Sequence, residues 1–136
     1  MHIGRHKENQ QMTSRIMLVD DDAALRLTLQ AILIDEGWDV VSAKDGFQAI
    51  QLASESQFAL ILMDFKMPGM NGVEALLKIK GILPNCVEVM MTGHAEEHQI
   101  EEALSNGVMT VLSKPVEIEK LLEIVDSVVP GKKIPS

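Results

Sequence analysis

The strongest constraint on the fold is a fivefold alternation of short apolar runs with longer amphipathic stretches. Several of the apolar runs do not alternate with polar residues, which is typical of strands that helices cover on both faces. The runs lie at residues 15–20, 39–42, 58–63, 87–91 and 110–113. This repeated alternation predicts an α/β fold, a doubly wound five-stranded parallel sheet with right-handed crossovers.

The intervening stretches carry apolar side chains at helical spacing. These stripes lie at residues 25–33, 49–53, 73–79, 100–104 and 118–125. The two ends of the chain, residues 1–14 and 130–136, are polar or rich in proline, so we expect tails there. A single domain over residues 15–129 is therefore predicted, within the usual domain size of ~100–200 residues.

The composition argues against several classes of function. With 12 basic and 20 acidic side chains, the 136-residue chain has a net charge of −8, which disfavours a nucleic-acid surface. No apolar run approaches the ~20 residues that span a bilayer, and the first segment does not resemble a secretory signal. The single cysteine, Cys86, cannot form an internal disulfide. These features predict a cytoplasmic protein without membrane or nucleic-acid contact.

Polar residues follow most of the predicted strands, at the edge where open parallel sheets bind ligands. They are Asp20-Asp21-Asp22, Asp64, Thr92 and Ser113-Lys114-Pro115. Carboxylates ~5 Å apart repel each other by about 3 kcal/mol per pair at an effective dielectric constant of ~20, so a cation is expected among them. Their hard oxygen atoms favour Mg²⁺ or Mn²⁺. Lys114 and Thr92 beside such an ion would suit a phosphoryl group.

Four motifs at these strand ends together resemble the receiver domain of two-component response regulators. They are VDDD at 19–22, LMDFKMPGMNG at 62–72, MMTGHA at 90–95 and LSKP at 112–115. The resemblance extends over about residues 15–129. It implies a flavodoxin-like sheet with strand order 2-1-3-4-5 and a bacterial signalling role in phosphorelay rather than turnover as an enzyme. The partner would be a sensor histidine kinase or a phosphotransfer protein.

The resemblance also implies a role for each residue around the phosphoacceptor. Asp64 matches the aspartate that takes the phosphoryl group from a phosphohistidine, with self-catalysed transfer and autodephosphorylation. Asp20, Asp21 and Asp64 match the acidic metal ligands, and the backbone carbonyl of Lys66 matches a further protein ligand for Mg²⁺. The side chains of Lys66 and His94 occupy positions that tune the lifetime of the phosphoryl group.

Other matching positions concern the response to phosphorylation. Thr92 and Lys114 are implied to contact phosphoryl oxygens, and the bond between Lys114 and Pro115 is often cis at this position in the family. Val111 stands where receivers usually carry Tyr or Phe, and the sequence contains no Tyr. The aromatic part of the usual switch is therefore missing, so a response would run through Thr92 and the backbone.

The surface expected to change combines the helix around 100–104, the strand 110–113 and the helix 118–125. Through this surface the domain would control a partner or an output domain, or form a homodimer. No recognisable output segment follows residue 129, so we expect a lone receiver or a fragment of a longer regulator.

Two enzyme classes match parts of the sequence. A phosphatase of the haloacid dehalogenase type would use Mg²⁺ with Asp20 as its nucleophile, but Ala24 breaks its signature. Asp22 is more simply explained as the N-cap of the helix that follows. A zinc peptidase is suggested by H-x-x-E-H at 94–98, but the sequence offers no identifiable third ligand.

Overall fold

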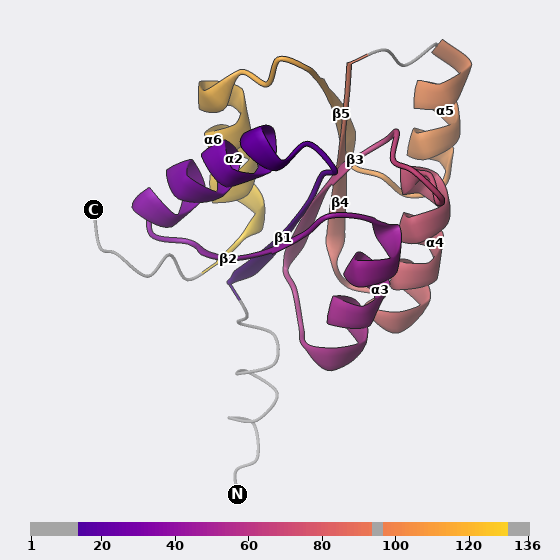
Figure 1. The fold of residues 1–136 in the computed structure, drawn as a ribbon, viewed down its shortest axis with the longest axis horizontal. Coiled ribbons are helices and arrows are strands. Elements are labelled where there is room, and N and C mark those ends of the chain that lie inside the picture. The colour runs from indigo at the N-terminus through magenta and orange to yellow at the C-terminus, as the bar shows by residue number, and fades with distance from the viewer. Residues whose placement is uncertain (1–13, 94–96, 131–136) are drawn as a thin grey trace, which may run out of the picture.

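The computed structural model describes residues 14–93 and 97–130. Five parallel strands form one sheet in the order β2-β1-β3-β4-β5, which confirms the predicted class and strand order (Figure 1). The strands are β1 (Arg15–Val19), β2 (Asp39–Ala43), β3 (Leu60–Asp64), β4 (Val87–Thr92) and β5 (Thr110–Ser113). The helices are α2 (Ala23–Asp35), α3 (Gly46–Glu55), α4 (Gly72–Ile82), α5 (Glu97–Ser105) and α6 (Ile118–Val128).

Helices cover both faces of the sheet. α2 and α6 lie on one face, and α3, α4 and α5 lie on the other (Figure 1). Alternate residues of each strand enter opposite cores: Leu62 packs with Leu29 and Val125, whereas Met63 packs with the α3–α5 layer. This two-sided burial is the reason that the apolar runs do not alternate with polar residues.

Several strand ends differ from the predicted ones by one or two residues. The first strand ends at Val19 rather than Asp20, because the Asp20 carboxylate accepts a hydrogen bond from the Asp22 N–H and the chain turns there. The third strand begins at Leu60 rather than Phe58, where pairing with Ile16 of β1 starts. It ends at Asp64, so the acidic residue itself belongs to the strand.

Side-chain caps fix the starts of three helices. Asp22 accepts a hydrogen bond from the Leu25 N–H at 3.1 Å, which confirms that it caps α2. Asp45 caps α3 in the same way, and Asn71 forms a capping box with Glu74 at the start of α4. Each of these helices therefore begins directly after the carboxyl end of a strand or the loop that follows it. None of the described helices is long and apolar enough to cross a membrane.

The charged residue Glu88 is buried near the start of β4, at the opposite end of this strand from the carboxyl edge of the sheet. Glu88 is 1% exposed, and neither of its carboxylate oxygens has a hydrogen-bond partner within the described residues. Lys80 Nζ lies 3.7 Å from Glu88 Oε1, an ion pair that is longer than a hydrogen bond. Burial raises the pKa of Glu88, which Lys80 only partly offsets.

Candidate functional site

Three carboxylates meet at the carboxyl edge of the sheet, two directly after β1 and one at the end of β3. One ligand oxygen each of Asp20, Asp21 and Asp64 lies within 4.8 Å of the others. Asp20 is fully buried, Asp64 is 5% exposed, and Asp21 is exposed at the mouth of the cluster. Parallel pairing of β1 with β3 explains the arrangement, because Val19 is in register with Met63, so the next residue of each strand lies at the same height.

Lys114, directly after the end of β5, lies beside the carboxylates of Asp20 and Asp64. Its Nζ lies 2.9 Å from Asp20 Oδ2 and 3.3 Å from Asp64 Oδ1. The Lys114 N–H donates to the carbonyl of Thr92, which holds the end of β5 beside the end of β4. Burial alone would lower the pKa of Lys114, but the hydrogen bond to Asp20 and the charges of Asp64 and Asp20 raise it overall. One ammonium group is thus shared between two buried carboxylates.

The acidic cluster changes the ionisation of Asp64. Burial, followed by the charge of Asp20, raises the pKa of Asp64 from 3.8 to about 6, although Lys114 opposes the shift. The Lys66 N–H lies 3.5 Å from Asp64 Oδ1, so it contributes only a weak hydrogen bond. The raised pKa shows that the single ammonium group does not compensate for the desolvation and repulsion.

Asp20 is held from all sides. Its Oδ1 accepts from the Asp22 N–H at 2.9 Å, and its own N–H donates to the Ala43 carbonyl at 3.2 Å. Arg26 Nη1 donates to the Asp20 carbonyl at 2.6 Å from the first turns of α2. The sequence gives no indication of this contact of Arg26, because an arginine within a helix carries no signal that it reaches back to a strand end.

The remaining predicted residues lie around this cluster or outside the described residues. Thr92 is buried at the end of β4, next to β3, since Asp64 is in register with Met91. The Lys114–Pro115 peptide bond is cis. Val111 is partly buried in β5 and lines a cavity together with Thr92. His94 lies outside the described residues.

The ligand atoms favour a particular kind of cation. The cluster Asp20, Asp21 and Asp64 consists of carboxylates, without the imidazole or thiolate ligands that select zinc. Hard oxygen ligands in a partly exposed pocket fit Mg²⁺ or Mn²⁺, which keep water in their coordination shell. A divalent ion would also remove the repulsion that raises the pKa of Asp64.

The fold and the site define a doubly wound α/β protein with an acidic cluster and one lysine at the carboxyl edge of its sheet. The sequence family described as "Response regulator receiver domain" matches residues 16–126. The chain therefore belongs to the receiver domains of two-component response regulators, and it acts in phosphorelay signalling. Receiver domains are signalling domains and generally not enzymes.

Relatives of different lengths share this domain. Sporulation initiation phosphotransferase F of Bacillus subtilis is 32% identical over 121 residues, which cover 89% of this chain and 98% of the relative. The transcriptional regulatory protein ZraR of Klebsiella oxytoca is 37% identical over 106 residues, which cover 78% of this chain but 24% of the relative. A CheY-like receiver domain protein of Methanospirillum hungatei has a similar structure, with a TM-score of 0.78, 32% identity, and coverage of 85% of this chain and 95% of that one.

The two enzyme classes are not favoured by these findings. The phosphatase would need Asp20 as its nucleophile, but Asp20 is fully buried, and its two carboxylate oxygens accept hydrogen bonds from the Asp22 N–H and Lys114. The histidine and glutamate positions suggested for a zinc peptidase begin at residue 94, outside the described residues. Family membership accounts for the sequence without either activity.

Proposed function

We propose that Asp64 accepts a phosphoryl group from the phosphohistidine of a sensor histidine kinase or a phosphotransfer protein. The observation that carries this proposal is the cluster of three carboxylates, in which Asp64 is the one that contacts Lys114 and also keeps an oxygen atom without a hydrogen bond. Both oxygens of Asp20 accept hydrogen bonds, whereas Asp64 Oδ2 has no hydrogen-bond partner within the described residues.

Phosphoryl transfer from the phosphohistidine to Asp64 needs no further reactant. Asp64 Oδ2 forms a bond to phosphorus, the P–N bond of the phosphohistidine breaks, and the electron pair leaves with the imidazole. In autodephosphorylation, water would attack the phosphorus atom of the acyl phosphate, and the products would be the free Asp64 carboxylate and inorganic phosphate. The protein's own site would catalyse both reactions. The protein is itself the acceptor, not an enzyme that turns over a separate substrate.

The carboxylates of Asp20, Asp21 and Asp64 and the backbone carbonyl of Lys66 would hold Mg²⁺ or Mn²⁺. When bound, the ion supplies positive charge that offsets the carboxylates and the incoming phosphoryl oxygens. Arg26 contributes indirectly, because its hydrogen bond to the Asp20 carbonyl fixes the turn that carries Asp20 and Asp21.

Lys114 and Thr92 would contact the phosphoryl oxygens after transfer. Phosphorylation adds a charge of about −1.5 to −2 near neutral pH. Lys114 Nζ already contacts Asp64 Oδ1 at 3.3 Å, so it lies within reach of a group attached to that carboxylate. Thr92 precedes the loop to α5, and Lys114 precedes the loop to α6. Movement at these two residues would therefore reach the surface of α5, β5 and α6.

The side chains of Lys66 and His94 would tune the phosphoryl lifetime.

Signal output would pass through this α5–β5–α6 surface to a separate target or to an output domain following the receiver unit, residues 15–129. A homodimer through the same surface is a second form of output. The charge of −8 and the family point to a cytoplasmic setting without nucleic-acid contact by this domain.

A small phosphodonor tests the acceptor. With acetyl phosphate and MgCl₂, the unmodified protein should gain one phosphoryl group in its intact mass, and Asp64→Asn should gain none. The product should be stable in acid and labile in base, as an acyl phosphate is. Omission of divalent ions with EDTA should remove most of the mass gain.

Asp20→Asn is the variant that separates the receiver from the phosphatase. In the receiver it should retain slow phosphorylation, because the acceptor is intact, whereas a phosphatase would lose its nucleophile. Full labelling of Asp64→Asn, or steady phosphate release that requires Asp20, would contradict the proposal.

A further inference from the structure

The aromatic side chain of Phe47 lies in the first turn of α3, at the carboxyl edge of the sheet. It is 59% exposed and belongs to neither of the two core clusters. Its neighbour in space is the segment that joins β3 to α4, residues 65–71, which we call the β3–α4 loop. This loop follows Asp64 directly and includes Lys66.

The ring of Phe47 packs against Gly69 of the β3–α4 loop. A Cβ atom at Gly69 would lie 3.1 Å from Phe47 Cε2 and 3.8 Å from Phe47 Cζ, so the ring occupies the space that a side chain at residue 69 would need. Gly69 has a φ of +83°, in the left-handed region that favours glycine. The loop therefore turns at the same residue that the ring covers.

Gly46, next to Phe47 in α3, receives the loop at a second point. A Cβ atom at Gly46 would lie 3.1 Å from Met70 Sδ and 3.2 Å from Ala75 Cβ. Met70 is 8% exposed and packs into the core between the sheet and α3–α5. Two adjacent residues of α3 thus hold two adjacent residues of the loop, one from the core and one from the surface.

The start of α3 is also connected to the strand end that carries Asp20. The Asp20 N–H donates to the carbonyl of Ala43, the last residue of β2, at 3.2 Å. Asp45 then caps α3 by accepting a hydrogen bond from the Gln48 N–H at 2.8 Å. The segment between β2 and α3 therefore links the position of Asp20 to the loop that follows Asp64.

We propose that Phe47 is a positioning residue for the divalent-cation site, because its ring holds the β3–α4 loop where the Lys66 carbonyl can coordinate the ion. This inference rests on the proposed function, in which that carbonyl is a cation ligand. Phe47 itself would contact neither the ion nor the phosphoryl group. Within the loop, the Lys66 N–H lies 3.5 Å from Asp64 Oδ1, a hydrogen bond too weak to fix the Lys66 backbone alone.

Isothermal titration calorimetry with MgCl₂ on the full chain tests this role. Phe47→Ala should weaken Mg²⁺ binding by about tenfold, the lower end of the effect of residues that orient a metal ligand. Phe47→Tyr keeps the ring and should bind Mg²⁺ as the unmodified protein does. Leu77→Ala is the matched control, since it removes a 47% exposed apolar side chain from α4 and should leave the affinity unchanged.

Phosphorylation by acetyl phosphate at increasing MgCl₂ distinguishes positioning from a general loss of structure. Phe47→Ala should need about tenfold more Mg²⁺ to reach half of its maximal rate, and it should then reach the same maximal rate as the unmodified protein. Its midpoint of chemical denaturation should stay close to that of the unmodified protein, because the side chain is largely exposed.

The results separate failure of this inference from failure of the proposed cation site. Mg²⁺ binding by the unmodified protein with equal affinity in Phe47→Ala would overturn the role of Phe47 and leave the cation site in place. A loss of affinity that Phe47→Tyr shares, or a lower maximal rate with a shifted denaturation midpoint in Phe47→Ala, would also overturn it. Absence of Mg²⁺ binding by the unmodified protein would overturn both the cation site and the role of Phe47.

Discussion

Gly72→Ala is expected to lower the free energy of unfolding by about 2–3 kcal/mol, a typical effect of overpacking a dense interior. A Cβ atom at Gly72 would lie 2.7 Å from the backbone oxygen of Asp64 and 3.1 Å from Phe65 Cα, and it would also clash with Met90 Cε. Met90 can move, but the backbone of β3 cannot do so without displacing Asp64. The Gly72 N–H also donates to the Phe65 carbonyl at 2.8 Å, so both groups would have to shift. Chemical denaturation measures the loss.

Gly81→Ala is the matched control, because it adds the same methyl group to the same helix. No atom lies within 4 Å of a Cβ at Gly81, so only helix propensity changes. This variant should gain about 0.5–1 kcal/mol. Equal stability of the two variants would show that the close approach of α4 to β3 is not a constraint. Phosphorylation of Gly72→Ala should also slow, since the acceptor strand is displaced.

Asp64→Asn is expected to raise the free energy of unfolding by about 2–3 kcal/mol at pH 7.5 in the absence of divalent ions. Burial and the charge of Asp20 raise the pKa of Asp64 to about 6 in the folded state, against an ordinary value of 3.8. Ionised Asp64 therefore destabilises the fold at neutral pH, at about 1.4 kcal/mol for each tenfold change in proton affinity. Asn has no charge and removes this penalty.

The sign of the pH dependence follows from the raised pKa. The penalty is fully present above pH 6, and it disappears as the pH falls through 6 toward 3.8. The stability difference between Asp64→Asn and the unmodified protein should therefore shrink over this range in denaturation curves at several pH values. Asp35→Asn, at the exposed end of α2, is the control and should stay within about 0.5 kcal/mol throughout. A constant difference from pH 4 to 8 would contradict the strained acidic cluster.

Much of the fold could be predicted because burial on two faces leaves a direct trace in the sequence. The strand β3 is apolar up to Asp64, and all five of its residues are buried. The cap at Asp22 was equally readable, since an aspartate directly before a helical stripe has few other uses. Strand order came from the resemblance, because periodicity alone does not say which strands are neighbours.

The site was predictable to the level of residue type and sheet edge, but not to the level of contacts. The sequence placed Asp20, Asp64 and Lys114 at strand ends. That Asp20 and Asp64 share the ammonium group of Lys114 depends on distances between strands far apart in the chain. The raised pKa of Asp64 depends on burial in the same way. Arg26 could not be identified, because its partner is a backbone carbonyl that any residue could provide.

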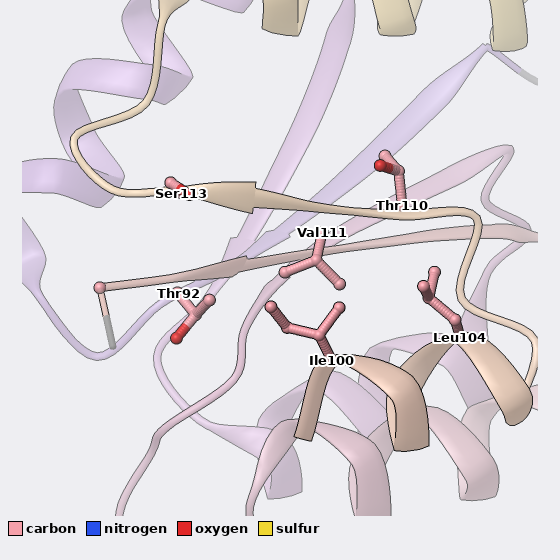
Figure 2. Close-up of a pocket in the computed structure, with 7 residues that line it drawn as sticks. Thr92, Ile100, Leu104, Thr110, Val111 and Ser113 are labelled. Atoms are coloured by element: carbon pink, nitrogen blue, oxygen red, sulfur yellow. The ribbon is translucent and has the colours of Figure 1, made fainter. Parts of the chain in front are cut away.

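Two other features could be found only from the folded structure and not from the sequence. Glu88 lies in a run that the sequence indicates as an apolar strand, and nothing local shows that its carboxylate is buried with only Lys80 near it. A cavity is lined by Val111 of β5 together with Ile100 and Leu104 of α5, which lie in separate elements of the chain (Figure 2). A single valine in a strand would ordinarily indicate packed core.

Isothermal titration calorimetry with MgCl₂ determines whether the three carboxylates form one divalent-cation site that serves Asp64. We expect saturable binding to a single site in the unmodified protein. Asp21→Asn should weaken it at least about tenfold, because Asp21 is an exposed member of the cluster whose loss leaves the core intact. Absence of Mg²⁺ binding by the unmodified protein, or equal affinity in Asp21→Asn, would show that these carboxylates do not form one cation site.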